Sequence, residues 1–403
     1  MITGASVNVL DYGADPTGVA NSSIAINAAL AAGSNIYIPA GTYRIDSVLL
    51  PKTSQNIHGE GVNVSVLKAH TAGMTVIDYP SGSYNNINLS NFTVNGDSLA
   101  AKGINIISAA QGACSAIYLN RISVGLCTTN ALYMSQVTYS AINDCAFSGG
   151  INTVYFNNMY SSAMTDSIVY DGSTASMYLS GSVQIVFRKT EFFNSAPVSP
   201  ADALVILSSC NANKFYACTF EAQGANGVVY EVELKGSIST ENSFIDCSFT
   251  GTPTTKQNCI AVGTTGGTYH TVIQGCRFFK PALSSSILLV AQQEACIVGC
   301  TDLTAYDSIP FIPVTVTGTG DYFLEQLNGQ FITAISAPSV SAQAVSTPLV
   351  NLTATVTISY GTGSPEGSLI AGIGSIYSNL SGGAGTTFYV KESGTGNTGW
   401  VAK

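Results

Sequence analysis

The chain has 403 residues, of which 46% are hydrophobic and only 9% are charged, and its formal net charge is −9 at pH 7. This apolar content excludes disorder, and the scattered Lys and Arg residues exclude binding to nucleic acid or to an anionic membrane. No apolar run reaches the roughly 18 residues that a membrane helix needs, which excludes membrane insertion. We therefore expect a soluble protein, made in the cytosol because MITGASVNVL lacks the basic region of a signal peptide.

Residues 1–60 are predicted to form an N-terminal cap and the first turn of the core. Asn21, Ser22 and Ser23 are candidate N-caps for the run IAINAALAA, which has the composition of a short helix. Gly33 follows at the position typical of a C′ glycine. We expect this helix to cover one end of the core. The alternative is an amphipathic helix that binds a partner.

Residues 61–305 repeat a short pattern, in which an apolar or small reference residue is followed two residues later by an apolar one. The reference residues, 22 to 30 positions apart, are Phe92, Ile122, Cys145, Ser167, Thr190, Cys218, Cys247, Cys276 and Cys300. A period of this length is typical of a solenoid. Gly, Asn, Ser and Thr separate short apolar runs without a helical period, which indicates strands joined by turns. The pattern therefore predicts a parallel β-helix.

Three N-terminal segments carry a resemblance to a known family. They are VNVLDYGADPTGVANSSIAINAALAA (residues 7–32), IYIPAGTYRI (36–45) and IHGEG (57–61). Together they resemble the start of the pectate-lyase-like right-handed β-helix of many phage tailspikes. The resemblance implies a homotrimeric spike of the virion tail, in contact with other tail proteins, that binds and often cleaves a bacterial surface polysaccharide. Tailspikes commonly carry a further N-terminal attachment domain, so we expect either a trimmed chain or docking through another protein.

Residues 306–403 are predicted to form a β-rich module for trimerisation or glycan binding. Residues 363–400 are similar to the terminal segment of assorted phage tail and spike proteins. Within them, the runs SIYSNL and TTFYVKE alternate around glycine-rich turns, as strands do. The predicted fold class is therefore all-β: a right-handed parallel β-helix solenoid with a short N-terminal capping helix and a small C-terminal β module.

Charged residues gather beside the reference positions, although the chain has few charges. Because strand side chains alternate, the neighbours of an inward reference residue face outward. This predicts one outer face over four coils that carries Arg121, Asp144, Asp166, Lys189 and Glu191. On straight strands Asp144 and Asp166 would lie about 4.8 Å apart, and Asp166 and Glu191 roughly 8 Å apart. The second distance fits inverting glycoside hydrolysis.

The predicted catalytic residues are therefore Asp166, Glu191 and Asp144, with one carboxyl protonating the leaving oxygen while another activates water. Anionic sugar groups would bind to positively charged side chains, and sugar rings would stack on tyrosines. The predicted substrate-binding residues are Arg121, Lys189, Arg188, Tyr170 and Tyr155. Three alternatives stay open: aspartates that only cap turns, a lyase that works by β-elimination with calcium, and a noncatalytic glycan-binding adhesin.

A second candidate pair is Glu231 and Glu233 in the run VVYEVELK. Strand alternation places both carboxyls on one outer face, roughly 6.7 Å apart, with Lys235 beyond them. Tyr230, Val232 and Leu234 would then face inward. The alternative is a solvated strand face without chemistry.

The ten cysteines are predicted to be buried thiols rather than a disulfide framework, which is typical of short secreted domains. Cys296 and Cys300 are four residues apart, but no second cysteine pair or nearby histidine completes a zinc site. We therefore predict no metal ion and no cofactor.

Overall fold

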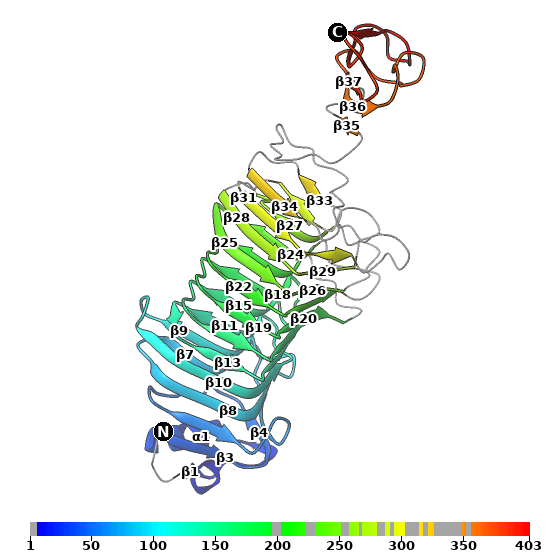
Figure 1. The fold of residues 1–403 in the computed structure, drawn as a ribbon. Helices are drawn as coiled ribbons and strands as arrows, with labels where there is room; N and C mark the ends of the chain where they lie inside the picture. The colour runs from blue at the N-terminus through cyan, green and yellow to red at the C-terminus, as the bar shows by residue number, and fades with distance from the viewer. Residues whose placement is uncertain are drawn as a thin grey trace. The chain divides into compact units, whose positions relative to one another are not determined.

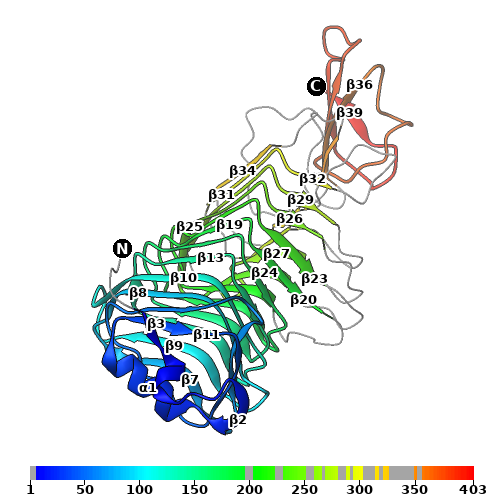
Figure 2. The ribbon, with the colours of Figure 1, turned by 90° about the horizontal axis from the view of Figure 1, so that it is seen from below.

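The computed structural model describes residues 6–195, 203–222, 230–250, 258–265, 268–279, 287–290, 294–302, 314–316, 321–325, 349–351 and 356–403. The chain divides into two compact units, residues 1–338 and 339–403. The first unit is a stack of coils built from parallel strands, and Figures 1 and 2 show these strands side by side from β3 to β34. The two units are described separately.

The N-terminal cap begins with β1 (Val7–Asn8), the 3-10 helix η1 (Val9–Tyr12) and β2 (Thr17–Asn21), followed by α1 (Ser23–Ala32). The predicted helix is thus confirmed. Its buried residues include Ile26 and Leu30, which belong to the solenoid core. The helix therefore covers the first coil.

The two ends of α1 differ in detail from the expected caps. Ser22 occupies the N-cap position without a side-chain capping bond, whereas the Asn21 side chain accepts a hydrogen bond from the Ser23 amide at 2.9 Å. Gly33 has extended backbone (φ −153°) rather than the left-handed conformation. A Cβ at Gly33 would lie 2.6 Å from Val7 Cγ2, so this glycine is needed for close packing.

A ten-stranded parallel sheet forms one wall of the first unit. In chain order its strands are β7 (Thr75–Gly82), β9 (Lys102–Ser108), β11 (Asn130–Ser135), β15 (Asn152–Asn157), β18 (Ala175–Ser180), β21 (Ala203–Ser208), β24 (Tyr230–Lys235), β27 (Asn258–Val262), β30 (Ile287–Leu289) and β33 (Val314–Val316). Each strand pairs with the corresponding strand of the next coil, as a solenoid requires.

A 24-stranded sheet forms the remaining walls. With β1 and β2 it contains β3 (Asn35–Ile38), β4 (Gly41–Ile45), β5 (Asn56–Gly59), β6 (Ser65–Ala69), β8 (Asn85–Asn95), β10 (Cys114–Gly125), β12 (Val137–Thr138), β13 (Ala141–Asn143), β14 (Ala146–Ser148), β16 (Ala163–Thr165), β17 (Ile168–Tyr170), β19 (Val186–Arg188), β20 (Glu191–Asn194), β22 (Lys214–Tyr216), β23 (Thr219–Ala222), β25 (Ile238–Ile245), β26 (Ser248–Phe249), β28 (Thr268–Gln274), β29 (Arg277–Phe278), β31 (Glu294–Val298), β32 (Thr301–Asp302) and β34 (Asp321–Glu325).

From β13 onward each coil bends between two strands of this sheet. The strands before the bend are β13, β16, β19, β22, β25, β28 and β31, and we call them the pre-bend strands. The strands after it are β14, β17, β20, β23, β26, β29 and β32, the post-bend strands. Parallel coil-to-coil pairing continues through β33 and β34, so it extends beyond residue 305, the predicted end of the solenoid.

The predicted reference residues form a column in the core, because all nine are at most 3% exposed. Phenylalanines on both sides of this column stack from coil to coil. Phe215 lies between Phe187 and Phe244, with ring centroids 4.6 and 4.9 Å away. Phe220 lies between Phe192 and Phe249, at 5.3 and 4.7 Å. The repeat is therefore confirmed as the register of the solenoid.

The cysteines of the repeat are structural. The Cys247 thiol donates to the carbonyl of Phe215 in the preceding coil at 3.4 Å, and Cys276 donates to that of Phe244 at the same distance. Burial raises the pKa of the Cys145 thiol to about 12, which keeps it protonated and unreactive at neutral pH. The prediction of buried thiols is confirmed for nine of the ten cysteines, since only Cys296 is partly exposed.

The second unit contains a five-stranded sheet formed by β35 (Leu349–Asn351), β36 (Thr357–Gly361), β37 (Ile376–Asn379), β38 (Phe388–Lys391) and β39 (Trp400–Ala402). Ala371, Tyr377, Tyr389 and Trp400 form its small core. Lys391 is fully buried, and its ammonium group donates to the carbonyls of Gly396 and Thr398. The predicted all-β fold class, with one capping helix and a C-terminal β module, is thus confirmed. No helix within the described ranges is long and apolar enough to cross a membrane.

Candidate functional site

The residues just before the reference positions lie in the bend of each coil. Arg121, Asp144, Asp166 and Lys189 have positive φ angles of 54°, 51°, 47° and 47°, and all four side chains are exposed. Gly275 takes the same place in a later coil with φ 64°. Aspartate is among the residues that best tolerate this left-handed conformation. The left-handed backbone of the bend is therefore a structural reason for the presence of aspartate at positions 144 and 166.

The bend also changes the predicted geometry of Asp166 and Glu191. Glu191 pairs with Ile168, so the two carboxyls do differ by one coil and two residues. However, Asp166 lies in the bend and Glu191 begins the post-bend strand β20. The spacing of roughly 8 Å assumed a straight strand, and the left-handed residue breaks that assumption. The pairing of Asp166 with Glu191 in catalysis stays a prediction.

Asp144 and Arg121 lie in neighbouring bends and form an ion pair. Arg121 Nε lies 3.7 Å from Asp144 Oδ2, and the two side chains are 66% and 70% exposed. An ion pair this exposed contributes little to stability. Both groups therefore remain accessible to a ligand.

Glu191 has a second carboxyl neighbour, Glu221, which is not among the predicted site residues. In the next coil Glu191 pairs with Thr219, and Glu221 follows two residues later on the same straight strand, β23. Combining about 4.8 Å between strands with about 6.7 Å along the strand separates the two positions by roughly 8 Å. Burial, and then the charge of Glu221, raise the pKa of Glu191 above its usual range. Glu191 is thus suited to carry a proton.

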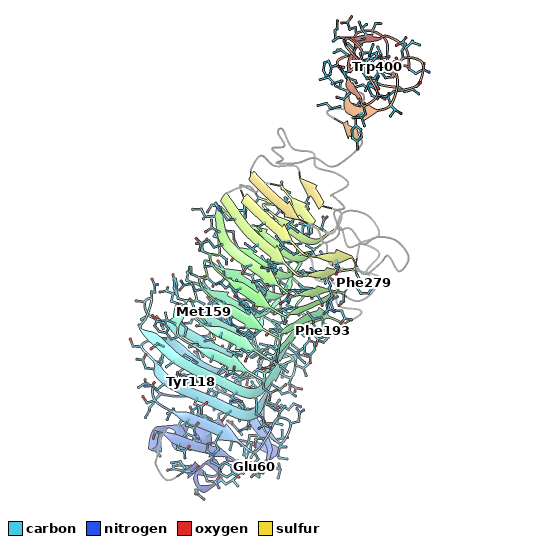
Figure 3. All side chains as sticks on the ribbon, in the orientation of Figure 1. Glu60, Tyr118, Met159, Phe193, Phe279 and Trp400 are labelled. Carbon is cyan, nitrogen blue, oxygen red and sulfur yellow. The ribbon has the colours of Figure 1, made fainter. Side chains whose placement is uncertain are left out.

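An aromatic pair lies beside these two acids. Tyr170 and Phe193 stack with ring centroids 4.7 Å apart and planes 5° from parallel, and Phe193 pairs in turn with Glu221. Figure 3 labels Phe193 in the same part of the solenoid as the post-bend strands. We call Tyr170, Glu191, Phe193 and Glu221 the Glu191 surface. All four side chains are partly exposed, so the surface combines two carboxyls with two aromatic rings.

Two of the predicted cationic residues, Lys189 and Arg188, lie next to this surface along the chain. Lys189 lies in the bend, and Arg188 ends the pre-bend strand β19. The Arg188 guanidinium lies over the ring of Tyr216, 4.5 Å from its centroid. Arg188 therefore faces the pre-bend side, while Glu191 lies on the post-bend side.

Tyr155 belongs to a different wall, the ten-stranded sheet. Its ring lies between those of Tyr133 and Tyr178, at centroid distances of 5.2 and 5.0 Å. The Lys102 ammonium lies 4.1 Å from the Tyr133 centroid and donates to Asn105 Oδ1 at 3.1 Å. We call these three tyrosines the tyrosine row. Tyr155 and Tyr170, which were predicted to serve one site, thus belong to separate surfaces.

The alternative pair, Glu231 and Glu233, does not form the expected outer face. Val232 and Leu234 are in the core as predicted, but Glu231 is fully buried and Glu233 is only 7% exposed. Tyr230 packs against a separate cluster with Ala203 and Ile206 instead of facing the main core. This departs from the simple alternation that the prediction assumed.

Glu233 is held by neighbouring polar groups. Its carboxylate forms an ion pair with Lys235 at 2.9 Å and accepts a hydrogen bond from Thr264 Oγ1 at 2.6 Å. These contacts compensate for burial of the charge. The prediction of an open carboxylate pair is therefore wrong, because neither acid is exposed.

Two signals could have revealed the missed residues. Phe193 and Glu221 each stand three positions after a reference residue, where alternation again points outward, as it does for the predicted residue Tyr170. The tyrosine row stands out as one tyrosine between apolar residues in LYM, VYF and MYL. Among the described residues, no group of three or more His, Cys, Asp and Glu side chains is arranged to hold a metal ion.

Comparison with known proteins identifies the fold family. The model of the family Rhamnogalacturonase A/epimerase, pectate lyase-like, matches residues 6–219. None of the curated protein sequences compared with the chain matches it.

Three solved structures share the fold at low sequence identity. ORF18 of Geobacillus virus E2 is 17% identical over 80% of this chain and 62% of its own, with a TM-score of 0.52. The catalytic unit of the GH87 α-1,3-glucanase of Streptomyces thermodiastaticus is 14% identical over 83% and 70%, with a TM-score of 0.53. Gene product 12 of bacteriophage phi29 is 14% identical over 82% and 52%, with a TM-score of 0.50. The chain thus spans less than two thirds of either viral protein.

These structures show the fold alone, whereas the family model covers more than half of the chain. The protein belongs to the pectate lyase-like family of rhamnogalacturonase A and epimerases.

Proposed function

We propose that the protein is a phage tailspike that binds and hydrolyses a bacterial surface polysaccharide, either a capsule or a lipopolysaccharide. The observation that carries the proposal is the Glu191 surface, in which two carboxyls lie beside the stacked pair Tyr170 and Phe193. The pectate lyase-like fold is usually carbohydrate-active or carbohydrate-binding, and two structural relatives are viral. These findings support the class of ligand and the phage origin.

The proposed reaction is inverting hydrolysis. The spacing of roughly 8 Å between Glu191 and Glu221 lies within the range of about 6.5–9.5 Å that leaves room for a water molecule. Glu191, with its raised pKa, donates its proton to the glycosidic oxygen as the bond from that oxygen to the anomeric carbon breaks. Glu221 takes a proton from the water whose oxygen forms the new bond to the anomeric carbon. Exchange with solvent then restores both groups.

Substrate binding is assigned to the surrounding side chains. A sugar ring would pack against Tyr170 and Phe193, whose partly exposed rings offer an apolar contact. Lys189 and Arg121 would contact anionic sugar groups from the bend. Asp166 and Asp144 are the competing candidates for the second carboxyl, because they lie in the adjacent bend column.

A reducing-end assay on host polysaccharide tests the proposal. Glu191→Gln and Glu221→Gln are each expected to lower the rate at least a hundredfold, because general acid–base groups contribute about 10²–10⁴-fold. Asp166→Asn is expected to keep most of the activity. Asparagine tolerates the left-handed bend, so this variant changes the charge without straining the backbone.

Asp246→Asn is the matched control, since Asp246 occupies the same bend column with φ 54°. If Asp166→Asn rather than Glu221→Gln abolishes cleavage, the base is Asp166. If Glu191→Gln stays folded and cleaves at the parent rate, the hydrolase proposal is wrong. Ultraviolet absorbance from unsaturated uronates would instead identify a lyase.

The tyrosine row favours a second candidate function, a spike that binds glycan without cleaving it. Three neighbouring partly exposed rings beside Lys102 form a surface of aromatic and hydrogen-bonding groups that needs no acid pair. Glycan binding without new reducing ends, lost in Tyr155→Ala but not in Glu191→Gln, would support this candidate.

The C-terminal unit supports the homotrimer that we propose for the spike. One face of its sheet is buried by Tyr377, Tyr389 and Trp400. On the opposite face a row of apolar side chains crosses four paired strands: Ile358, Ile376, Val390 and Val401. Tyr360 and Phe388 add to this face, at 51% and 39% exposure.

Strand alternation also places Glu392 and Lys403 on this face, where they form an ion pair of 2.6 Å with each other. A second copy would therefore meet the apolar row beside charges that are already paired. An apolar surface of this kind marks an interaction site, and we assign it to other copies of the chain. Light scattering is expected to give three times the chain mass of 41.7 kDa. The double variant Ile358→Ser, Val401→Ser should release monomers. A parent protein that runs at the monomer mass would contradict the proposal.

A further inference from the structure

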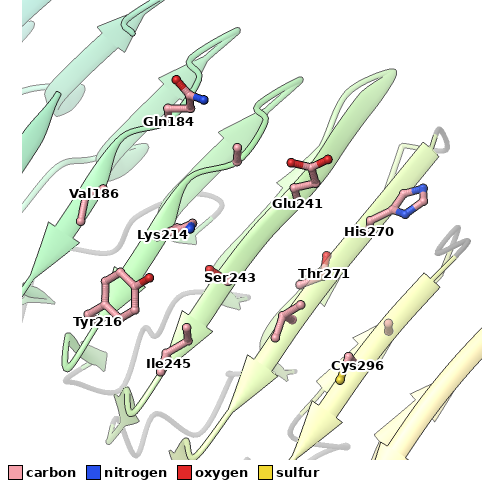
Figure 4. A pocket seen from close by; sticks show the side chains of 13 residues that line it. Gln184, Val186, Lys214, Tyr216, Glu241, Ser243, Ile245, His270, Thr271 and Cys296 are labelled. Atoms are coloured by element: carbon pink, nitrogen blue, oxygen red, sulfur yellow. The ribbon is translucent and has the colours of Figure 1, made fainter. Parts of the chain in front are cut away.

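A groove lies on the outer face of the pre-bend strands, on the other side of the bend from the Glu191 surface. Its volume is about 1140 Å³, and its lining includes Lys214, Tyr216, Glu241, Ser243, His270 and Thr271. Figure 4 shows these side chains on neighbouring strands of successive coils. The volume exceeds the roughly 300–1,000 Å³ of typical small-molecule pockets. The groove therefore has room for an extended ligand.

The floor of the groove contains two hydroxyl groups without partners. Ser243 is 7% and Thr271 is 2% exposed. Ser243 Oγ and Thr271 Oγ1 are buried, and neither has a hydrogen-bond partner in the part of the chain that the structure describes. Burying an unsatisfied polar group costs about 1–3 kcal/mol. A polar ligand that reaches the floor would recover this cost.

One wall of the groove combines an aromatic ring with positive charge. Tyr216 and Lys214 alternate with a core residue on β22, so their side chains share the outer face. Tyr216 is partly buried, whereas Lys214 is exposed. The Arg188 guanidinium lies against the Tyr216 ring, 4.5 Å from the centroid. This wall thus offers an aromatic ring with one cation over it, Arg188, and a second cation on the same strand, Lys214.

The opposite end of the groove carries hydrogen-bonding groups on two successive coils. Glu241 has a positive φ of 58°, at an irregularity in β25 between Ser239 and Asn242 that turns its side chain outward. His270 lies on β28 in the next coil and is partly exposed. Figure 4 shows both side chains at the same end of the groove. They can bond to ligand hydroxyls.

We propose that this groove is a second saccharide-binding site, separate from the Glu191 surface, and that it takes an acidic saccharide. Tyr216 packs against a sugar ring, while Lys214 and Arg188 contact the carboxylate of the sugar. Ser243 and Thr271 gain hydrogen bonds from its hydroxyls or from a water that it holds, and Glu241 accepts bonds from further hydroxyls. This inference rests on the proposed function in one respect only, namely that the ligand is a saccharide.

Isothermal titration calorimetry with two sets of bacterial oligosaccharides tests the site, one bearing uronate or other carboxylate sugars and one neutral. We expect binding of acidic members in preference to neutral ones of equal length. Lys214→Ala and Tyr216→Ala should each weaken that binding at least tenfold. Raising sodium chloride should weaken it in the parent protein, because exposed charge pairs are screened by salt.

Two variants outside the groove are matched controls. Tyr118→Ala removes a ring that is 46% exposed on the same sheet, and Lys68→Ala removes an exposed ammonium group near the N-terminus. Both should bind within twofold of the parent. The proposal is overturned if no acidic oligosaccharide binds, or if Lys214→Ala and Tyr216→Ala both bind within twofold of the parent.

Failure of the proposed function gives a different pattern. The tenfold losses expected for Lys214→Ala and Tyr216→Ala should also appear in a Glu191→Gln background, since Glu191 does not line the groove. If the parent protein binds through Lys214 and Tyr216 but releases no reducing ends, the saccharide-binding role of the groove is supported. The same result refutes the proposed hydrolysis. Cleavage that survives both groove substitutions, with binding unchanged, would refute the groove alone.

Discussion

Phe220 lies inside a stack of four phenylalanines, Phe192, Phe220, Phe249 and Phe278, and its replacement by alanine probes what holds the coils together. The side chain is fully buried, and its ring stacks between Phe192 and Phe249 at 5.3 and 4.7 Å. Truncating a buried Phe costs about 3–5 kcal/mol. Two stacked neighbours place the loss in the upper part of that range, because each aromatic pair adds about 0.5–1.5 kcal/mol beyond buried area. We expect Phe220→Ala to lower the free energy of unfolding by about 4–5 kcal/mol.

Phe193→Ala is the matched control, because this ring is partly exposed and stacks on Tyr170 outside the core. We expect it to cost about 1 kcal/mol. Urea unfolding followed by far-ultraviolet circular dichroism measures the solenoid, and the midpoint shift multiplied by a common m-value yields the difference. Trp400, the one tryptophan of the chain, reports the second unit and is recorded separately. A loss for Phe220→Ala no larger than that for Phe193→Ala would refute the stacking argument.

Three further predictions concern titration and reactivity. Because burial and then the charge of Glu221 raise the pKa of Glu191, Glu221→Gln should lower that pKa in a carboxyl ¹³C NMR titration; an unchanged value would contradict the coupling. Hydrogen bonds from the Ala20 amide and from Thr17 hold the Asp15 pKa at about 2, against 3.8, so their stabilisation is complete above pH 4 and is lost toward pH 2. The melting temperature should therefore fall over this window by more in the parent than in Asp15→Asn, and equal falls would argue against this role. A thiol reagent should label at most Cys296 in the native protein and all ten cysteines after denaturation; rapid native labelling of several thiols would contradict the burial.

The solenoid register could be predicted from the sequence because it depends on repeated burial. Cys218, Cys247 and Cys276 are equally spaced, and the phenylalanine two positions later recurs each time. Residues that stack on their counterparts in neighbouring coils are limited to side chains that fill the same volume. Such a column leaves a periodic signal, whatever the length of the turns between the strands.

The candidate site could be predicted only in part, because the bend has no periodic signal of its own. Arg121, Asp144, Asp166 and Lys189 differ in charge and size, yet all adopt the same left-handed backbone. The prediction therefore assumed that side chains keep alternating between inward and outward across the bend, where the chain in fact changes direction. Glu191 and Tyr170 lie together on the Glu191 surface, whereas Tyr155 lies on another wall.

Glu231 and Glu233 show a second limit of alternation. The pattern distinguishes inward from outward positions, but it does not say what covers an outward position. Glu233 carries a charge, yet it is almost completely buried and paired with Lys235. The sequence alone could not predict the burial of Glu233, because its hydrogen-bond partner Thr264 comes from a later coil.

The bend also explains how one set of coils can offer two separate surfaces. Arg188 and Glu191 are three residues apart in the sequence, but one ends a pre-bend strand and the other begins a post-bend strand. Arg188 contacts Tyr216 beside the groove, whereas Glu191 is paired with Ile168 and Thr219 on the other side. Because outer side chains of a solenoid contact only their neighbours and a ligand, each surface can change its chemistry without disturbing the core column. Proximity in the sequence therefore does not imply a shared site here, and the column that a residue occupies decides which ligand it can contact.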